Sequence, residues 1–485
     1  MGTVLNPPPV TAAAAGVAFE RYLQWASRVE WSAVSQAARH HVVLVLADDL
    51  AAAFSALDEP QVAVARQRMM AAATGGPASL LAPRRPRVSV LQAATGNGLA
   101  MGWNELDEGY RKAVCHAGLY VLPALLACAE AEGASLQELL RAALLGYETV
   151  SRIACSWRFP AMLIHPHALL APVGAAAGVG FLRRLPAEEL LSAISGAATM
   201  GMAGPFNHAL QGVLARNTWA AQGAASGLAA LEWAHCGIGG QASTPHDVYA
   251  TALGAKADLA PLAPHADDGW AVESGYHKMN ACCQYAHSTI EAVQSLLAKN
   301  PQLKGGEQLA SIQVEVHPLG YGLDDHRPTT TLGAKFSVPH AVAAALVHGN
   351  GGVASFDAAS LGNPRIARLR DITRLVPFPD VRPWPDDRPA RVTVTSQAGE
   401  RFDALCWSAQ GGPDRPFSED ALWSKVAALS LAQAPGFAGA MREMSRLVQS
   451  KDTAEALARP WSAWLDDFFL LDVLDTGATS FSEHE

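Results

Sequence analysis

Residues 215–235 read ARNTWAAQGAASGLAALEWAH, a run in which small side chains gather on one side of a predicted helix. This pattern is typical of a helix that packs closely against its neighbours in an interior. A second small-residue run, GAAAGVG at 174–180, lies in a helical stretch and follows no strand. It therefore favours close helix packing over a nucleotide-binding loop.

The helical pattern extends outward from these runs over residues 14–269, where strand signals are scarce. Ser135 and Glu138 form a capping-box pattern that predicts a helix over residues 136–154. Pro186, followed by two glutamates, predicts the first turn of another helix. The first half of the chain is therefore predicted to be helical.

The pattern changes near residue 305. Residues 311–317 alternate apolar and polar side chains and predict a strand, and residues 335–348 predict a helix. Residues 391–396 and 401–406 predict a hairpin. Residues 377–389 are proline-rich and predict an extended connector. The helical pattern returns after Pro416, so the fold class predicted is mainly α, with a smaller α+β segment inserted.

Composition limits the function classes. The chain has 485 residues and a net charge of −9, which disfavours nucleic acid as a partner. Seven cysteines without a CxxC spacing indicate neither a disulfide framework nor a zinc ribbon, so a cytoplasmic location is expected. The longest apolar run, residues 168–182, is shorter than the roughly 20 residues of a membrane span, and no membrane partner is expected.

Several common catalytic motifs are absent. The sequence contains no GxGxxG, GxxxxGK[ST], HExxH or GxSxG. A nucleotide cofactor, a zincin site and a hydrolase nucleophile elbow therefore lack support.

The first candidate site is the acidic segment NELDEGYR at 104–111, followed by His116. Glu105, Asp107 and Glu108 repel one another unless they are solvated or paired. A solvated turn before a helix is the simpler interpretation. An acid–base group is the alternative.

The second and third candidates are His165 and Arg216. Pro166 suits the first helical position, which places His165 at a helix start in a capping or catalytic role. No third ligand accompanies His165 and His167, so no metal is predicted. Arg216, beside an apolar helix, needs a carboxylate partner, from either the protein or a substrate.

The richest cluster is GYHKMNACCQYAH at 275–287, on the border between the helical and α+β parts. Clefts at such borders often bind ligands, so His277, Lys278 and Tyr285 become candidates. A lysine there could act as a base or hold a carboxylate. A weaker patch, residues 317–327, contains Tyr321 and could line the same cleft.

With these residues in view, the chain resembles the MmgE/PrpD family, which includes 2-methylcitrate dehydratase, cis-aconitate decarboxylase and iminodisuccinate epimerase. The resemblance rests on the order of these segments: ELDEG with His116, LLGYETVSRI at 144–153, HPH at 165–167, ARNTWA at 215–220, HKMNACCQYAHSTIEA at 277–292 and AKFSVPHAVAAAL at 334–346. Their order is specific for the family but not for a reaction.

The resemblance implies a large helical domain built from both chain ends, residues 1–271 and 412–485, with an α+β lid domain over residues 272–411. It also implies a homodimer that needs no organic cofactor and no metal. The implied substrates are small di- or tricarboxylates, from which a proton or a carboxylate is removed.

Residue by residue, Glu105 and Asp107 match the acidic DFDDT-like segment of similar enzymes, and His116 matches the histidine that follows it. His165, Lys278 and Tyr321 match a helix-start histidine, a cleft lysine and a lid tyrosine. The sequence also departs from the family pattern at these positions: Arg216 for a lysine, Trp219 for a histidine, Gly109 for a threonine and Ala117 for a proline. These departures argue against assigning 2-methylcitrate or cis-aconitate to this chain as its substrate.

The resulting hypothesis is a cofactor-independent hydro-lyase that dehydrates a small hydroxy-carboxylate. Arg216 and Lys278 would hold carboxylates, and His165 would remove the α-proton. His116 and Glu105 would protonate or position the leaving hydroxyl. Asp107, His277, Tyr285 and Tyr321 are the further substrate-binding candidates. The alternatives are an isomerase or epimerase, a decarboxylase, or an inactive member that serves as a binding or scaffold protein.

Overall fold

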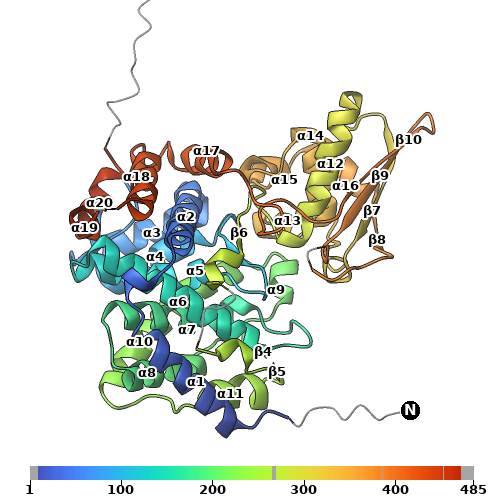
Figure 1. The fold of residues 1–485 in the computed structure, drawn as a ribbon. Coiled ribbons are helices and arrows are strands. Elements are labelled where there is room, and N and C mark those ends of the chain that lie inside the picture. Colours follow the sequence, from blue (N-terminus) through green and yellow to red (C-terminus); the bar gives the residue numbers. More distant parts are fainter. Residues whose placement is uncertain (1–8, 265–268, 385, 452, 471–485) are drawn as a thin grey trace, which may run out of the picture.

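The computed structural model describes residues 9–264, 269–384, 386–451 and 453–470 (Figure 1). The fold is mainly helical, as predicted. The N-terminal part consists of α1 (Ala12–Ala26), α2 (Gln36–Ser55), α3 (Pro60–Ala72), α4 (Val90–Met101), α5 (Ala117–Ala131), α6 (Leu136–Ser156), α7 (Pro166–Leu182), α8 (Ala187–Thr199), α9 (Asn207–Leu210), α10 (Trp219–His235) and α11 (Thr244–His246).

Helices α7 and α10 pack against each other at close range in the centre of this part. A Cβ atom on Gly223 of α10 would lie 2.4 Å from the Cβ of Ala171 in α7. A Cβ on Gly227 would lie 2.5 Å from the Cβ of Ala175. Glycine is therefore required at both positions, and the close packing predicted for the two small-residue runs is confirmed.

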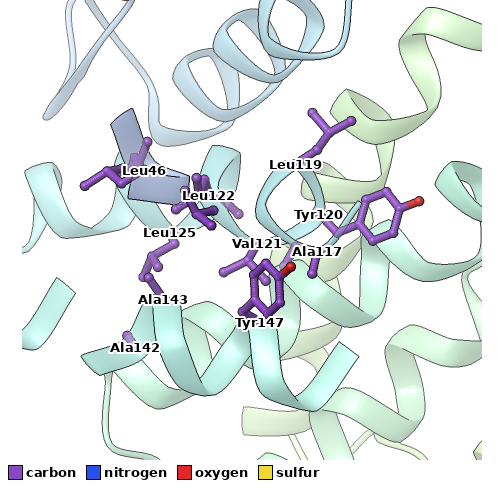
Figure 2. Close-up of a cluster of buried hydrophobic side chains, with 14 of the residues drawn as sticks. Leu46, Ala117, Leu119, Tyr120, Val121, Leu122, Leu125, Ala142, Ala143 and Tyr147 are labelled. Atoms are coloured by element: carbon purple, nitrogen blue, oxygen red, sulfur yellow. The ribbon is translucent and has the colours of Figure 1, made fainter. Parts of the chain in front are cut away.

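Helix α5 is anchored by a buried apolar cluster. Figure 2 shows its Leu122 and Leu125 gathered with Leu46 of α2 and with Ala142 and Ala143 of α6, all of them buried. Burying one leucine side chain stabilises a fold by about 1.5–3 kcal/mol. This packing fixes the start of α5, next to the acidic segment.

The C-terminal helices share the core of the N-terminal ones (Figure 1). They are α17 (Glu419–Ser430), α18 (Phe437–Gln449), α19 (Ala454–Leu457) and α20 (Trp461–Asp467). The ring of Phe437 contacts that of Phe54 in α2 edge to face, with centroids 5.0 Å apart. The two ends of the chain therefore contribute to one helical core.

A four-stranded sheet with its own helices lies between them in the sequence. Its strand order is β10–β9–β7–β8, with only β7 and β8 parallel. The elements are α12 (His287–Lys299), β7 (Leu309–Val316), α13 (Thr331–Lys335), α14 (Val338–His348), α15 (Ala358–Leu361), α16 (Pro364–Asp371), β8 (Thr373–Pro377), β9 (Ala390–Ser396) and β10 (Arg401–Cys406).

The predicted strand and hairpin are confirmed as β7, β9 and β10, whereas β8 was not predicted. The helix predicted over residues 335–348 is two helices instead. The first ends at Lys335, and the second begins at Val338 because the Ser337 side chain caps it and Pro339 occupies its first turn.

Short strand pairs connect distant segments. They are β1 (Ala78–Ser79) with β2 (Arg87–Val88), β3 (Gly109–Tyr110) with β6 (Gly275–Tyr276), and β4 (Trp157–Arg158) with β5 (Lys256–Ala257). The β3–β6 pair matters most, because it joins the acidic segment to the cluster at 275–287. Across the described ranges, no single helix has the length and hydropathy to cross a membrane. Helices α2 and α3 meet that test only together, with a 93° bend between them.

Candidate active site

The acidic segment is a buried turn, so the interpretation as a solvated turn is wrong. Glu105, Asp107 and Glu108 are each at most 2% exposed. Glu105 has a φ of 54°, which is uncommon for a residue other than glycine. Such conformations concentrate at functional sites, where surrounding packing sustains them.

A buried lysine holds this turn in place. The ammonium of Lys335 donates to Oδ1 of Asn104 at 2.8 Å and to the carbonyl of Trp103 at 3.2 Å. Asn104 in turn donates to the carbonyl of Ser55 at 3.1 Å. Burial lowers the pKa of Lys335 to about 8. The segment that carries Glu105 is thus attached to both α2 and α13.

Glu105 forms a buried ion pair with Arg216, so the partner of this arginine is a protein carboxylate. Nη1 of Arg216 donates to Oε1 of Glu105. The Nε and Nη2 atoms of Arg216 each lie 3.4 Å from Nε2 of His165. The guanidinium also lies 5.3 Å from the ring centre of Phe336. One glutamate, one arginine and one histidine therefore converge at this point.

Asp107 joins His116 to Lys278. Its Oδ2 lies 2.6 Å from Nδ1 of His116, and its Oδ1 lies 3.5 Å from the Nζ of Lys278. Burial raises the pKa of Asp107, but the charges of Lys278 and His116 outweigh burial and hold it below its usual value. Burial lowers the pKa of Lys278, yet Asp107 and Glu105 raise it above its usual value. Both groups are therefore charged at neutral pH, and Lys278 is suited to holding an anion, not to acting as a base.

His165 is the N-cap of α7, as predicted. Its Nδ1 accepts the backbone N–H of His167 at 3.2 Å. Burial, followed by the charge of Arg216, holds the pKa of His165 well below its usual value, so the ring is neutral. One neutral ring cannot accept at both nitrogens. The Nε–H of Arg216 also points at Nε2, at 3.4 Å, so the ring can satisfy only one of the two donors. The shorter contact at Nδ1 favours the tautomer with the proton on Nε2.

A second layer of carboxyl groups lies behind the turn. Oδ1 of Asp49 accepts the backbone N–H of Glu108 at 2.8 Å. Glu108 accepts from the backbone N–H of Gly118 at 2.8 Å and from the hydroxyl of Tyr147 at 2.9 Å. Burial raises the pKa of Glu108 to about 8 and that of Asp49 well above its usual value. Glu108 is thus protonated at neutral pH.

A small pocket lies at the centre of these groups. Among the predicted residues, it is lined by Glu105, His116, His165, Arg216 and Tyr285. Asp107 and Lys278 do not line it but lie directly behind His116 and Glu105, both about 1% exposed or less. The sequence therefore identified most of the charged groups at this pocket.

Besides Asp107, two predicted substrate-binding residues, His277 and Tyr321, lie outside the pocket. Nδ1 of His277 contacts Oδ2 of Asp48 at 2.8 Å, and the same carboxylate pairs with Lys425 of α17 at 2.5 Å. This network joins β6 to α2 and α17. Tyr321 is 45% exposed and does not contribute to the pocket lining.

Arg388 and Tyr276 line the pocket but were not predicted. Arg388 lies near the end of the proline-rich connector, and its guanidinium lies 4.8 Å from the ring centre of Tyr285. Its positive charge was the only sequence signal for a role at the pocket. Tyr276 explains the departure at residue 109, because a Cβ on Gly109 would lie 2.5 Å from the Tyr276 hydroxyl oxygen.

Among the described residues, no group of three or more His, Cys, Asp or Glu side chains is arranged to hold a metal ion. The charged groups at the pocket pair with one another instead. Their side chains can transfer protons and bind anions.

Comparisons with known proteins agree with this arrangement. The model of the MmgE/PrpD N-terminal domain matches residues 20–257, and that of the MmgE/PrpD C-terminal domain matches residues 281–438. The chain is also similar to the "Cis-aconitate decarboxylase-like protein oryM" of Aspergillus oryzae (strain ATCC 42149 / RIB 40). The two are 24% identical over 413 residues, which cover 76% of this chain and 81% of the relative.

Proposed function

Since this chain belongs to the MmgE/PrpD family, we propose that it is a cofactor-independent lyase of the dehydratase type. Its substrate would be a small hydroxy di- or tricarboxylate, from which the enzyme removes a proton next to a carboxylate. One observation carries this proposal: two histidines line one pocket, and each has its Nδ1 engaged, in His116 by Asp107 and in His165 by the backbone N–H of His167.

His116 is the better proton acceptor of the two. Its Nδ1–H donates to the ionised Asp107, which leaves the Nε2 lone pair for the pocket. A carboxylate placed in this way also stabilises the imidazolium that forms when the ring takes a proton. The sequence favoured His165 for proton removal. Because Nδ1 of His165 is occupied by the backbone N–H of His167, we assign proton removal to His116 instead.

His165 would act as a hydrogen-bond donor. A neutral imidazole at a helix start can polarise a substrate oxygen through its N–H, without giving up the proton. The Nε2–H of His165 would donate to the substrate carboxylate that accumulates charge when the α-proton leaves. The neighbouring Arg216 would add its positive charge to the same oxygen.

Positive charge at the pocket suits a polyanion. Lys278 and Arg216 balance Asp107 and Glu105 inside, while Arg388 adds a further positive charge at the pocket wall. Bound carboxylates would lie beside Arg216 and Arg388, which line the pocket, and burial strengthens each attraction. Arginine offers paired N–H donors that fit a carboxylate.

The proposed reaction balances within this set of groups. His116 takes the α-proton at Nε2, the carbon–oxygen bond breaks, and the protonated His116 passes its proton to the departing hydroxide, which leaves as water. Glu105, beside Arg216, would position the leaving hydroxyl. The product is an unsaturated polycarboxylate.

Decarboxylation is the second candidate, because the chain is similar to a protein named for cis-aconitate decarboxylase. In that case, His116 starts protonated, the carbon–carbon bond breaks, CO2 leaves, and His116 donates its proton to the carbanion and regains one from solvent. The same cations would stabilise the negative charge in either reaction.

Proton NMR of purified enzyme with a panel of hydroxy and unsaturated di- and tricarboxylates tests the proposal. A new vinyl proton with loss of the hydroxy-acid signal is the expected result. Release of CO2 would favour the second candidate, and inversion without loss of the hydroxyl would favour an epimerase. His235→Gln is a suitable control, since that histidine is 80% exposed on α10. No change in any compound would contradict both candidates.

A further inference from the structure

A second, larger pocket lies directly beside the proposed active site. Its free volume is about 290 Å³, against about 50 Å³ for the pocket that contains the two histidines. The two pockets share five lining residues: Ala113, Val114, Met162, Pro166 and Arg388. Pro166 directly follows His165, so the second pocket begins within one residue of the proposed site.

The inner wall of this second pocket is apolar. It includes Trp157, Phe159, Leu169, Leu170 and Tyr249. The rings of Trp157 and Tyr249 are 5.9 Å apart and almost completely buried. Such a wall offers few partners to a carboxylate, and burying an unpaired charge against it is costly.

Apart from Arg388, which both pockets share, the cations of the second pocket are not placed to hold a carboxylate on the apolar wall. Arg111 pairs with Asp387. Lys112 and Arg158 are exposed to solvent, at the outer edge. The pocket therefore combines an apolar interior with direct access to the cations of the proposed site.

From this geometry we propose that the substrate carries an apolar substituent of several carbons, which lies in the second pocket while its carboxylates stay at His116, His165 and Arg216. This inference rests on the proposed function, since it names the substrate class of the same site. A polycarboxylate without a substituent would leave the larger pocket without a matching group. Each methylene that enters it should improve binding about fourfold.

Titration calorimetry with a series of 2-alkylsuccinates measures this directly. Methyl-, propyl-, pentyl- and heptylsuccinate present one pair of carboxylates with chains of increasing length. The dissociation constant should fall by about fourfold per methylene until the pocket is filled. A dissociation constant that stays constant across the series, or no binding by any member, would overturn the inference.

A matched pair of variants tests whether the alkyl chain of the ligand lies in the second pocket. Ala154 lines the second pocket, whereas Ala161 is exposed and lines neither pocket. Ala154→Leu should reduce the preference for heptyl- over methylsuccinate by at least tenfold, because the added carbons occupy the same space. Ala161→Leu should leave that preference unchanged. The ratio is measured within one protein sample, so a partly unfolded preparation does not alter it.

Turnover separates this inference from the proposed function. Chain-length-dependent binding, with no turnover of any alkyl-substituted or unsubstituted polycarboxylate, would contradict the function and leave the pocket assignment intact. Equal kcat/KM for unsubstituted and alkyl-substituted substrates would contradict the pocket assignment and leave the function intact.

Discussion

Nδ1 of His116 lies 2.6 Å from Oδ2 of Asp107, whose other oxygen faces the ammonium of Lys278 at 3.5 Å. The three residues come from the acidic segment, the start of α5 and the segment that follows strand β6. The pairing of Gly109 in β3 with Tyr276 in β6 brings the acidic segment close to Lys278. One carboxylate thus orients a histidine and neutralises a buried cation.

Replacing Asp107 by Asn should therefore affect both activity and stability. Turnover should fall by about 10²–10⁴, because His116 loses the partner that orients it and stabilises its protonated form. The fold should lose about 3–5 kcal/mol, because Lys278 becomes an unpaired buried charge. Steady-state kinetics and urea unfolding measure the two effects. Asp380→Asn is the control, since Asp380 is exposed, and wild-type turnover in Asp107→Asn would exclude the dyad.

The Glu105–Arg216 pair should behave as a unit. Glu105→Gln and Arg216→Gln should each destabilise the protein by about 3–5 kcal/mol, because each leaves one buried charge unpaired. The double variant should cost less than the sum of the two, by at least about 1 kcal/mol. Urea unfolding of all four proteins gives this coupling. Additive losses would show that the ion pair contributes nothing to stability.

The free energy of unfolding should decrease as the pH rises from 6.5 to 8, because the pKa of Glu108 is raised in the folded protein. The folded protein keeps a proton on Glu108 up to a pKa of about 8, whereas the unfolded chain loses it near 4.5. Stability from this raised pKa is complete below pH 4.5 and is lost as the pH rises toward 8, by up to about 1.4 kcal/mol per unit. The pKa of the neighbouring Asp49 is raised as well, first by burial and then by the charge of Glu108.

Other buried groups titrate outside this interval. Burial lowers the pKa of His287 to about 3 and that of His41 to about 4, so their contribution is present above pH 6.5 and is lost only below it. Lys335 is the exception: burial lowers its pKa to about 8, so the folded protein begins to lose this proton within the interval, and the effect on stability is opposite in sign to that of Glu108. Denaturant unfolding between pH 6.5 and 8 should therefore show a smaller slope in Glu108→Gln. An unchanged slope would mean that Glu108 is ionised in the folded protein.

Gly109 should tolerate no side chain while Tyr276 is present. The added Cβ in Gly109→Ala would lie 2.5 Å from the Tyr276 ring, and overpacking of this kind costs about 1–3 kcal/mol. In a Tyr276→Ala background, the same change should cost much less. Thermal unfolding of the two single variants and the double variant measures the difference. An equal cost in both backgrounds would place the strain elsewhere.

Local patterns predicted much of the fold. The capping box at Ser135 and Glu138 and the hairpin around Gly399 are short-range signals, and both appear where expected. The break at Phe336 and Ser337 was missed, since an apolar pattern continues across it and only the cap reveals it. Strand β8 was missed because its partner, β7, lies about 60 residues away.

The site was harder to predict than the fold. His116, His165 and Arg216 could be selected because polar groups in apolar segments need partners. The layer formed by Asp49 and Glu108 could not, because nothing in one sequence tells a buried, protonated carboxyl from a solvated, ionised one. Arg388 depends on the path of the connector before it, which its sequence does not specify.

Removal of a substrate proton by His116 is the central claim, and proton NMR in deuterated water tests it most directly. Wild-type enzyme should remove the α-proton signal of at least one polycarboxylate in the panel, by elimination or by exchange with deuterium. His116→Gln should slow that loss by about 10²–10⁴ while remaining folded. An unchanged rate of proton loss in His116→Gln would contradict the account.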